Sequence, residues 1–191
     1  LVKVQATNFR SIEDSGEFEV GDLTCLVGKN EAGKTAVLRA IQGIRPTDSF
    51  EYDRTRDYPR RYLNKFDERH PDGESPVART WWSLDDDDIA EIEATLGDDV
   101  LQSSQIEVTS YIGRSGNTWS VHIDQKKCLR NLEARSSMKA EDKLPIKDFT
   151  TTTDALSTLK ALEEKTEPQQ SLITILESFR EGSAILAAID I

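Results

Sequence analysis

Eight consecutive residues, Gly28 to Thr35, have the types and the spacing that phosphate binding requires. They read GKNEAGKT and fit the pattern GxxxxGK[ST] at every fixed position. The glycines allow a tight turn whose successive backbone N–H groups point inward and form a nest for an anion. Lys34 can reach the β- and γ-phosphate oxygens of a nucleotide, and the Thr35 hydroxyl can ligate Mg²⁺. The segment is therefore predicted to be a P-loop, or Walker A motif.

The predicted binding residues follow from the motif and from the helix that it opens. Because this helix begins at the end of the motif, its unpaired N–H groups and its dipole also favour a bound phosphate. The residues predicted to bind the nucleotide are Gly28, Lys29, Asn30, Glu31, Ala32, Gly33, Lys34, Thr35 and Ala36. Lys34 is the predicted catalytic residue and Thr35 the predicted metal ligand. No GxGxxG, HRD or DFG sequence occurs, which argues against a dinucleotide fingerprint and a protein-kinase glycine loop.

A P-loop has to be held between a buried strand and a helix. The apolar run Leu23–Val27 immediately before the motif predicts a strand covered on both faces. After the motif, apolar residues at i, i+3, i+4 and i+7 predict one buried helix face, and Pro46 is expected to end that helix. These apolar residues are Val37, Ala40, Ile41 and Ile44.

Other elements are predicted from periodicities of 2 and 3.6 residues. The predicted strands are Leu1–Phe9, Glu17–Val20 and Pro76–Leu84, followed by a hairpin of Gln105–Ile112 and Thr118–Asp124. The predicted helices are one that begins at Asp85–Asp88, with Ile89, Ile92 and Leu96 on one face, and two later ones at Asp154–Glu164 and Gln170–Phe179. Acidic residues are favoured in the first turn of a helix, so the four aspartates are predicted to cap it rather than to bind metal.

The same patterns predict how the chain is divided. Residues 1–124 are expected to form the N-terminal lobe, 125–152 a polar linker and 153–191 a helical segment. Within the lobe, residues 47–75 form a long polar excursion without a clear period. Loops of this length can be lids or binding elements, or simply mobile, and we favour the last interpretation.

Composition limits the classes of function. The net charge of −11 over 191 residues argues against a broad nucleic-acid-binding face, so any DNA contact must be local or supplied elsewhere. The two cysteines, Cys25 and Cys128, show no metal-ligand spacing and predict no disulfide framework. The N-terminus does not read as a signal peptide, and the longest apolar run, Ala184–Ile189, is too short to cross a bilayer. We expect a soluble, cytoplasmic protein with no membrane partner.

The N-terminal segment resembles a known group of ATPases. A strand that ends in Asn8–Ile12, a short hairpin and GKNEAGKT together look like the start of ABC-type ATPase heads of the RecF and SMC superfamily. Within it, the closest resemblance is to OLD-family (overcoming lysogenization defect) ATPases and related AAA-type proteins. Asn30 matches the asparagine common in their loops, whereas Glu31 departs from the glycine of the SMC pattern. The match covers roughly the first 45 residues and is only suggestive beyond them.

The resemblance implies an α/β fold, a P-loop NTPase of ABC/RecF-SMC head type. This head is incomplete here, with an N-terminal mixed β-sheet, a β-hairpin and C-terminal helices. ATP and Mg²⁺ are the implied ligands, and a homodimer or higher oligomer is the implied assembly. In such heads the residues after the first strand lie beside the nucleotide, so Arg10 and Ser11 join the predicted ATP-binding residues. Phe9 could contact the base or pack in the core, and both alternatives stay open.

Several elements of the family pattern are missing from the sequence. No LSGG signature occurs, and Gln102 or Gln105 could be argued as a Q-loop residue without being convincing. The only run shaped like a Walker B strand is Ile185–Asp190, and Ile191 stands where a catalytic glutamate is expected. We therefore expect this to be the N-terminal part of a longer polypeptide, with the remainder of the head beyond the chain.

Three functions are compatible with these residues. The first is an OLD-like ATPase head whose hydrolysis drives or gates a DNA-acting machine, with a C-terminal Toprim nuclease and a role in phage defence implied by resemblance. The second is a RecF/SMC-like DNA-repair ATPase without a nuclease. The third is a non-hydrolysing, nucleotide-sensing scaffold module. In the first two, DNA would be bound by the full-length protein.

Overall fold

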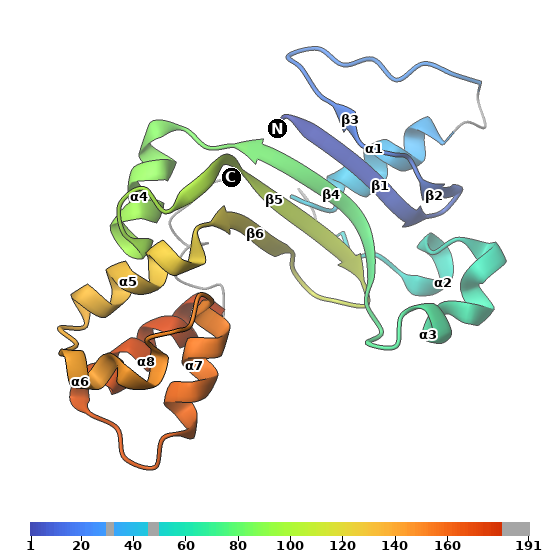
Figure 1. The fold of residues 1–191 in the computed structure, drawn as a ribbon. Coiled ribbons are helices and arrows are strands. Elements are labelled where there is room, and N and C mark those ends of the chain that lie inside the picture. The colour runs from blue at the N-terminus through green and yellow to red at the C-terminus, as the bar shows by residue number, and fades with distance from the viewer. Residues whose placement is uncertain (30–32, 46–49, 181–191) are drawn as a thin grey trace. The chain divides into compact units, whose positions relative to one another are not determined.

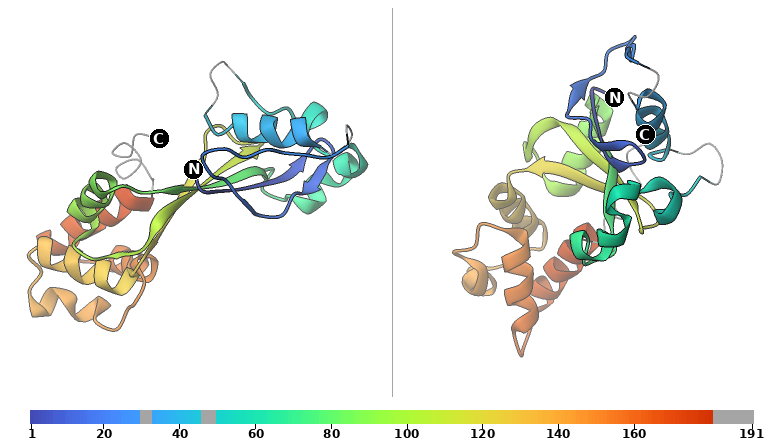
Figure 2. Two further views of the ribbon diagram at one scale, coloured as in Figure 1. Left: turned by 90° about the horizontal axis from the view of Figure 1, so that it is seen from above. Right: turned by 90° about the vertical axis from the view of Figure 1, so that its right-hand side faces the viewer.

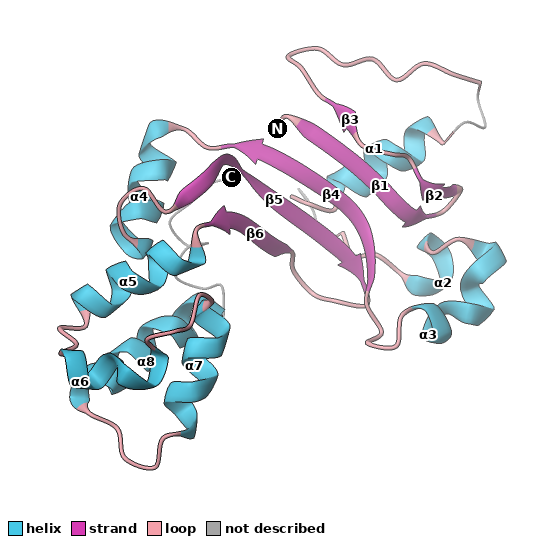
Figure 3. Ribbon diagram, viewed as in Figure 1, coloured by secondary structure: helices cyan, strands magenta, loops and turns pink. Residues whose placement is uncertain are grey.

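The described strands form one sheet in the order β2-β1-β4-β5-β6, with β3 also paired to β1 (Figures 1 and 3). The structure, a computed structural model, describes residues 1–29, 33–45 and 50–180. The strands are β1 (Lys3–Phe9), β2 (Ile12–Asp14), β3 (Phe18–Glu19), β4 (Ser75–Ser83), β5 (Leu101–Ile112) and β6 (Thr118–Ile123). The predicted first strand, tryptophan-bearing strand and hairpin are thereby confirmed, and β2 is an addition.

The chain divides into two compact units, each made of two segments. The first unit comprises Leu1–Ser83 and Gln105–Ser120, and the second comprises Leu84–Ser104 and the chain from Val121 onward. The long strands β5 and β6 therefore contribute residues to both units. The loop predicted to bind phosphate and its supporting elements belong to the first unit.

The expected mixed sheet is corrected by the pairing of its strands. β1 pairs antiparallel with β2, β3 and β4, and β4 pairs antiparallel with β5. The predicted buried strand at Leu23–Val27 is also wrong, because these residues form no strand and Leu23 and Val27 are 92% and 85% exposed. Both β3 and β4 pair with Lys3 and Val4, so β1 has no free edge there for another strand.

The helix after the predicted P-loop, α1 (Lys34–Gln42), packs on β1 and β4 on one face of the sheet (Figure 2). Its buried face includes Ala36, Val37 and Ala40, and Ile44 is buried just beyond its C-terminus, much as the apolar spacing predicts. Pro46, the predicted helix terminator, lies outside the described residues. The fully buried side chains of the sheet include Val4, Ala6 and Phe9 of β1.

The polar excursion contains regular secondary structure that its sequence pattern does not predict. It forms α2 (Arg54–Asp57), a 3-10 helix η1 (Arg60–Lys65) and α3 (Phe66–Arg69). Tyr58 and Phe66 are buried and pack edge to face, with ring centroids 4.8 Å apart. Two buried aromatic rings give this segment a small core of its own, so its described part forms helical turns around that core and is not irregular throughout.

The second unit is mostly helical. Its helices are α4 (Asp86–Leu96), α5 (Gln125–Arg135), α6 (Ala140–Lys143), η2 (Leu144–Ile146), α7 (Thr152–Ala161) and α8 (Glu167–Arg180). Asp85 caps α4, and its carboxylate and that of Asp88 form a capping box, which confirms the predicted helix start. The expectation of an irregular linker at 125–152 is wrong, because Asp124 caps α5 and Cys128, Leu129 and Leu132 bury one face of it.

Candidate nucleotide-binding loop

The loop ends at a glycine whose backbone only glycine adopts readily. Gly33 has φ 80° and ψ 8°, a left-handed conformation, and it is the N-cap of α1. The Val37 N–H donates to the Gly33 carbonyl at 2.9 Å, which starts the helical hydrogen bonding directly after the motif. The first N–H groups of α1 therefore have no partner within the helix, which is the arrangement that favours an anion at a helix N-terminus.

Lys34 folds back over the start of the loop. Its Nζ donates to the carbonyl oxygens of Gly28 and Lys29, each at 2.7 Å. The ammonium group therefore lies at the loop, where a phosphate at the helix N-terminus would meet it, instead of extending into solvent. Thr35 is exposed, so its hydroxyl is open to solvent. Ala36 is buried, and its role in nucleotide binding stays a prediction.

Ser11 and Ile12, which follow β1, lie close to the last glycine of the loop. A Cβ atom placed on Gly33 would lie 3.3 Å from Cγ1 of Ile12 and 3.4 Å from Oγ of Ser11. Phe9 is fully buried and packs edge to face against Tyr52, with centroids 5.7 Å apart, so core packing is its role in this structure. Of the other predicted binding residues, Asn30, Glu31 and Ala32 lie outside the described residues.

A cavity of about 590 Å³ borders Lys34. The turn between β1 and β2 and the apolar segment before the loop both line it. Its lining includes Ser11, Ile12, Thr24, Leu26, Val27 and Lys34. The two Q-loop candidates, Gln102 and Gln105, lie on β5 and are not among the described residues that line this cavity. The Walker B candidate, Ile185–Asp190, is outside the described part of the chain.

Arg10 makes its contacts with a residue that no sequence motif marks. Its Nε and Nη2 donate to Oδ1 of Asp57 at 3.0 and 2.9 Å, and Asp57 is fully buried. Burial raises the pKa of the Asp57 carboxyl, but hydrogen bonds from Arg56, the Asp53 amide and Arg10 outweigh it and hold that pKa below its ordinary value. The carboxylate is therefore charged at neutral pH. Asp53, a residue type favoured at a helix N-cap, was the available signal for this cluster, and its carboxylate accepts a hydrogen bond from the Arg56 N–H.

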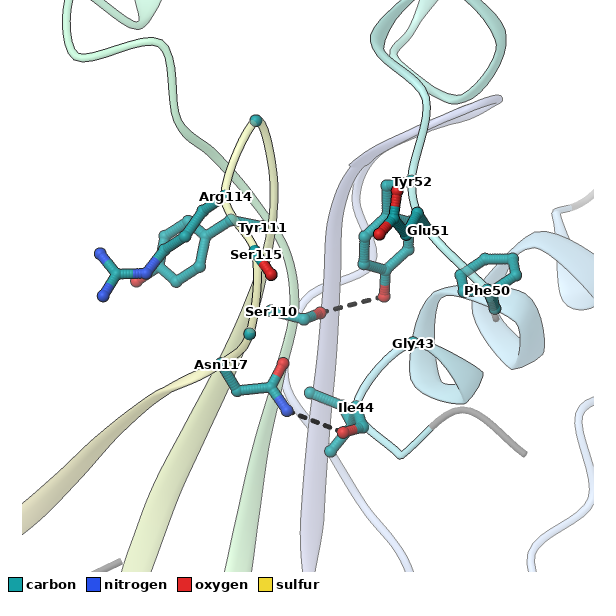
Figure 4. A pocket seen from close by; sticks show the side chains of 12 residues that line it. Gly43, Ile44, Phe50, Glu51, Tyr52, Ser110, Tyr111, Arg114, Ser115 and Asn117 are labelled. Carbon is teal, nitrogen blue, oxygen red and sulfur yellow. Dashed lines mark hydrogen bonds between the residues drawn. The ribbon is translucent and has the colours of Figure 1, made fainter. Parts of the chain in front are cut away.

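A second cavity, of about 430 Å³, lies at the other end of α1 (Figure 4). The Tyr52 hydroxyl donates to the Ala40 carbonyl at 2.6 Å and lies 3.0 Å from Oγ of Ser110, while Asn117 Nδ2 donates to the Ile44 carbonyl at 2.7 Å. Burial raises the pKa of Tyr52 to about 12, so the hydroxyl remains a donor. Because a helix C-terminus carries partial negative charge, phosphate is favoured at the Gly33 end instead.

Gly43, on the wall of this second cavity, allows a prediction. A Cβ there would lie 1.9 Å from the Tyr52 hydroxyl oxygen, so Gly43→Ala must displace the ring and break its bond to Ala40. We expect unfolding to become easier by about 1–3 kcal/mol, measured by denaturant titration with tryptophan fluorescence. All three tryptophans, Trp81, Trp82 and Trp119, lie in the first unit, so the signal reports this unit.

The matched control for Gly43→Ala is Gly21→Ala, because a Cβ at Gly21 meets nothing within 4 Å. That substitution is expected to change stability by less than about 0.5 kcal/mol. In a Tyr52→Ala background, Gly43→Ala should lose its cost because the clash is gone. Equal effects of Gly43→Ala with and without Tyr52 would contradict the steric explanation.

These features define a class of protein and then a family. A glycine-rich loop that opens a helix beneath a lysine ammonium is the arrangement of P-loop nucleotide-binding proteins. The model of the AAA ATPase domain matches residues 1–181, and the chain belongs to this family. Domains of this family are nucleotide-binding ATPases that generally use ATP and Mg²⁺. No curated protein matches the chain. Among the described residues, no helix is both long and apolar enough to cross a membrane.

Proposed function

We propose that the chain binds ATP with Mg²⁺ at Gly28–Thr35 and functions as an OLD-like ATPase. The observation that carries the proposal is the placement of Lys34, whose ammonium group reaches the first two residues of the loop while its backbone opens α1. In the proposed complex, Lys34 neutralises charge on the β- and γ-phosphates, and the first N–H groups of α1 bind phosphate oxygens. Ser11, beside Gly33, lines the same site.

When bound, Mg²⁺ would supply positive charge that offsets the negative charge of the polyphosphate. The Thr35 hydroxyl is the protein ligand that we propose for it, and an exposed hydroxyl at the second position of α1 suits this role. Such sites hold Mg²⁺ through few protein groups together with substrate phosphates and water. The remainder of the catalytic machinery is proposed to come from residues outside the described structure and from dimerisation.

The wider role is proposed from the resemblance of the Asn8–Ile12 segment and the loop. We propose that ATP turnover drives or gates a DNA-acting machine, in which heads pair around the nucleotide. The chain carries a net charge of −11, so DNA contact is assigned to the full-length protein or to a local patch. Phosphate release that is stimulated by DNA in the full-length protein would support this role. Binding of ATP without turnover in the full-length protein would favour a nucleotide-sensing scaffold instead.

Substitution of Thr35 tests the proposed metal ligand. For the wild-type chain, calorimetric titration with ATP should show tighter binding when Mg²⁺ is present. Thr35→Val keeps the shape of the side chain but removes the hydroxyl, so we expect ATP affinity with Mg²⁺ to fall about tenfold, equivalent to about 1.4 kcal/mol. Affinity without Mg²⁺ should change little. Thr35→Ser retains the hydroxyl and is expected to behave like wild type; equal Mg²⁺ dependence in both variants would refute the assignment.

A further inference from the structure

The polar excursion forms hydrogen bonds and an ion pair with both ends of the turn between β1 and β2. At one end, Asp57 accepts two hydrogen bonds from the Arg10 guanidinium, at 3.0 and 2.9 Å. At the other end, Glu13 forms an ion pair with Arg61 and accepts a hydrogen bond from the Tyr62 hydroxyl at 3.0 Å. The contacts connect residues 47 to 49 positions apart in the sequence, so the excursion fixes this turn by tertiary contacts.

Asp57 fixes the main chain of the turn as well as a side chain. The Arg10 N–H donates to the Asp57 carbonyl oxygen at 2.6 Å. Arg10 has φ 54°, a left-handed conformation that costs a non-glycine residue energy and persists only where its surroundings enforce it. Three hydrogen bonds from one residue to its partner, through backbone and side chain, supply that constraint here.

Asp57 is itself held rigidly. Its second carboxylate oxygen accepts hydrogen bonds from Arg56 at 2.7 Å and from the Asp53 N–H at 3.1 Å. The residue is fully buried, whereas the Arg10 and Arg56 side chains are 30% and 59% exposed. A buried carboxylate with both oxygens engaged cannot rotate without losing several charge-assisted bonds, so it provides a fixed anchor.

Ser11 and Ile12, in the middle of this turn, are the residues that contact the loop. Ser11 and Ile12 lie within 3.4 Å of the position that a Cβ on Gly33 would occupy, and Ile12 is 8% exposed. Gly33 caps α1 and directs its first N–H groups. A displacement of the turn would therefore remove the packing that holds Gly33, and with it the position of the anion site.

From these contacts we infer that Asp57 is a positioning residue for the P-loop: by locking residues 10–12 against Gly33, it sets the affinity of the loop for the polyphosphate of a nucleotide. The inference rests on the proposed function. Asp57 touches neither Gly33 nor Lys34 through any hydrogen bond between described residues, so its effect is transmitted by the turn.

The test is the affinity of the intact chain for ATP and Mg²⁺ by calorimetry, at a temperature where circular dichroism shows each variant to be folded. Asp57→Asn is expected to weaken binding about tenfold, within the range usual for coupling between sites. The control is Asp67→Asn, the same chemical change on an acid of the same excursion that is 78% exposed and pairs with Arg54. A purely structural role would lower the melting temperature without changing the affinity of the folded protein.

Two further experiments test the inference if Asp57→Asn folds poorly. The double variant Arg61→Ala/Tyr62→Phe releases the opposite end of the turn without changing a buried charge, and about threefold weaker binding is expected. In addition, Ile12→Ala should cost less affinity in the Asp57→Asn background than alone, because both substitutions disrupt one contact. Additive losses, or unchanged affinity in both the Asp57 and the Arg61/Tyr62 variants, would overturn the inference.

A readout without nucleotide separates this inference from the proposed function. Amide chemical shifts of Gly33 to Val37 in the free chain should change in Asp57→Asn and stay unchanged in Asp67→Asn. If wild type binds no ATP, the proposed function fails, and the claim about affinity fails with it, whatever the shifts show. If wild type binds ATP but neither shifts nor affinity respond to Asp57→Asn, the inference alone is wrong.

Discussion

Lys34→Ala is expected to weaken ATP binding about 100-fold. In the structure the Lys34 ammonium lies within 2.7 Å of two carbonyl oxygens at the start of the loop, where it can exchange them for phosphate oxygens. A hydrogen bond to a charged group contributes about 1.5–3 kcal/mol, so the loss of two gives at least about 3 kcal/mol. Calorimetric titration with ATP and Mg²⁺ measures the change directly.

The matched control for Lys34→Ala is Arg39→Ala, in the same helix. Arg39 is exposed in the last turn of α1 and lines neither cavity, so its removal changes the net charge by the same amount without touching the loop. Its affinity for ATP should stay within about twofold of wild type, because long-range interactions between exposed charges are screened at physiological ionic strength. If Lys34→Ala binds as tightly as Arg39→Ala, the proposed nucleotide site has no support.

The sequence predicted those parts of the site whose conformation is set by residues close together in the chain. The conformation at Gly33 and the start of α1 at Lys34 follow from residues next to each other, and the motif predicted them. The same holds for the cap at Asp85, whose partner Asp88 is three residues away. Each of these depends on a short-range rule, so one segment of sequence contained all the information.

The predictions that were wrong fall on residues whose neighbours in space are distant in the sequence. The apolar run Leu23–Val27 predicted a covered strand, but an apolar composition cannot by itself show whether a neighbouring strand is present. In the structure both edges of β1 are already paired at Lys3 and Val4. The mixed sheet was implied by the family resemblance, and the antiparallel pairing of β1 with β2, β3 and β4, and of β4 with β5, corrects it.

The excursion and α5 were missed for a different reason, which is that charged residues outnumber apolar ones there. Only Tyr58 and Phe66 are buried hydrophobic residues in residues 54–69, too few to give a period. In α5 the buried face of Cys128, Leu129 and Leu132 is interrupted by four basic residues among eleven. Short helices of this kind are stabilised by tertiary contacts more than by propensity, so sequence patterns detect them poorly.

The buried carboxylate of Asp57 leads to the largest stability effect that we predict. Asp57→Ala removes the common partner of Arg10, Arg56 and the Asp53 N–H. Breaking a buried ion pair typically costs about 3–5 kcal/mol, and because both arginines are partly exposed we expect the lower end, about 3 kcal/mol. Denaturant unfolding followed by tryptophan fluorescence should show a lower midpoint. Asp67→Ala, which breaks an exposed pair with Arg54, should cost less than about 1 kcal/mol.

The dependence of this loss on pH identifies its cause. The pKa of Asp57 is lowered in the folded chain, so its charged form stabilises the fold above its ordinary pKa of about 3.9, and the contribution is lost as pH falls through the lower, folded pKa. The stability difference between wild type and Asp57→Ala should thus be constant from pH 7 to pH 5 and shrink below pH 4. Other lowered carboxyls, such as Asp14 and Asp142, titrate in both proteins and cancel in that difference. A difference that stays constant down to pH 2 would show that Asp57 stabilises the fold by packing, not as the charged partner of Arg10.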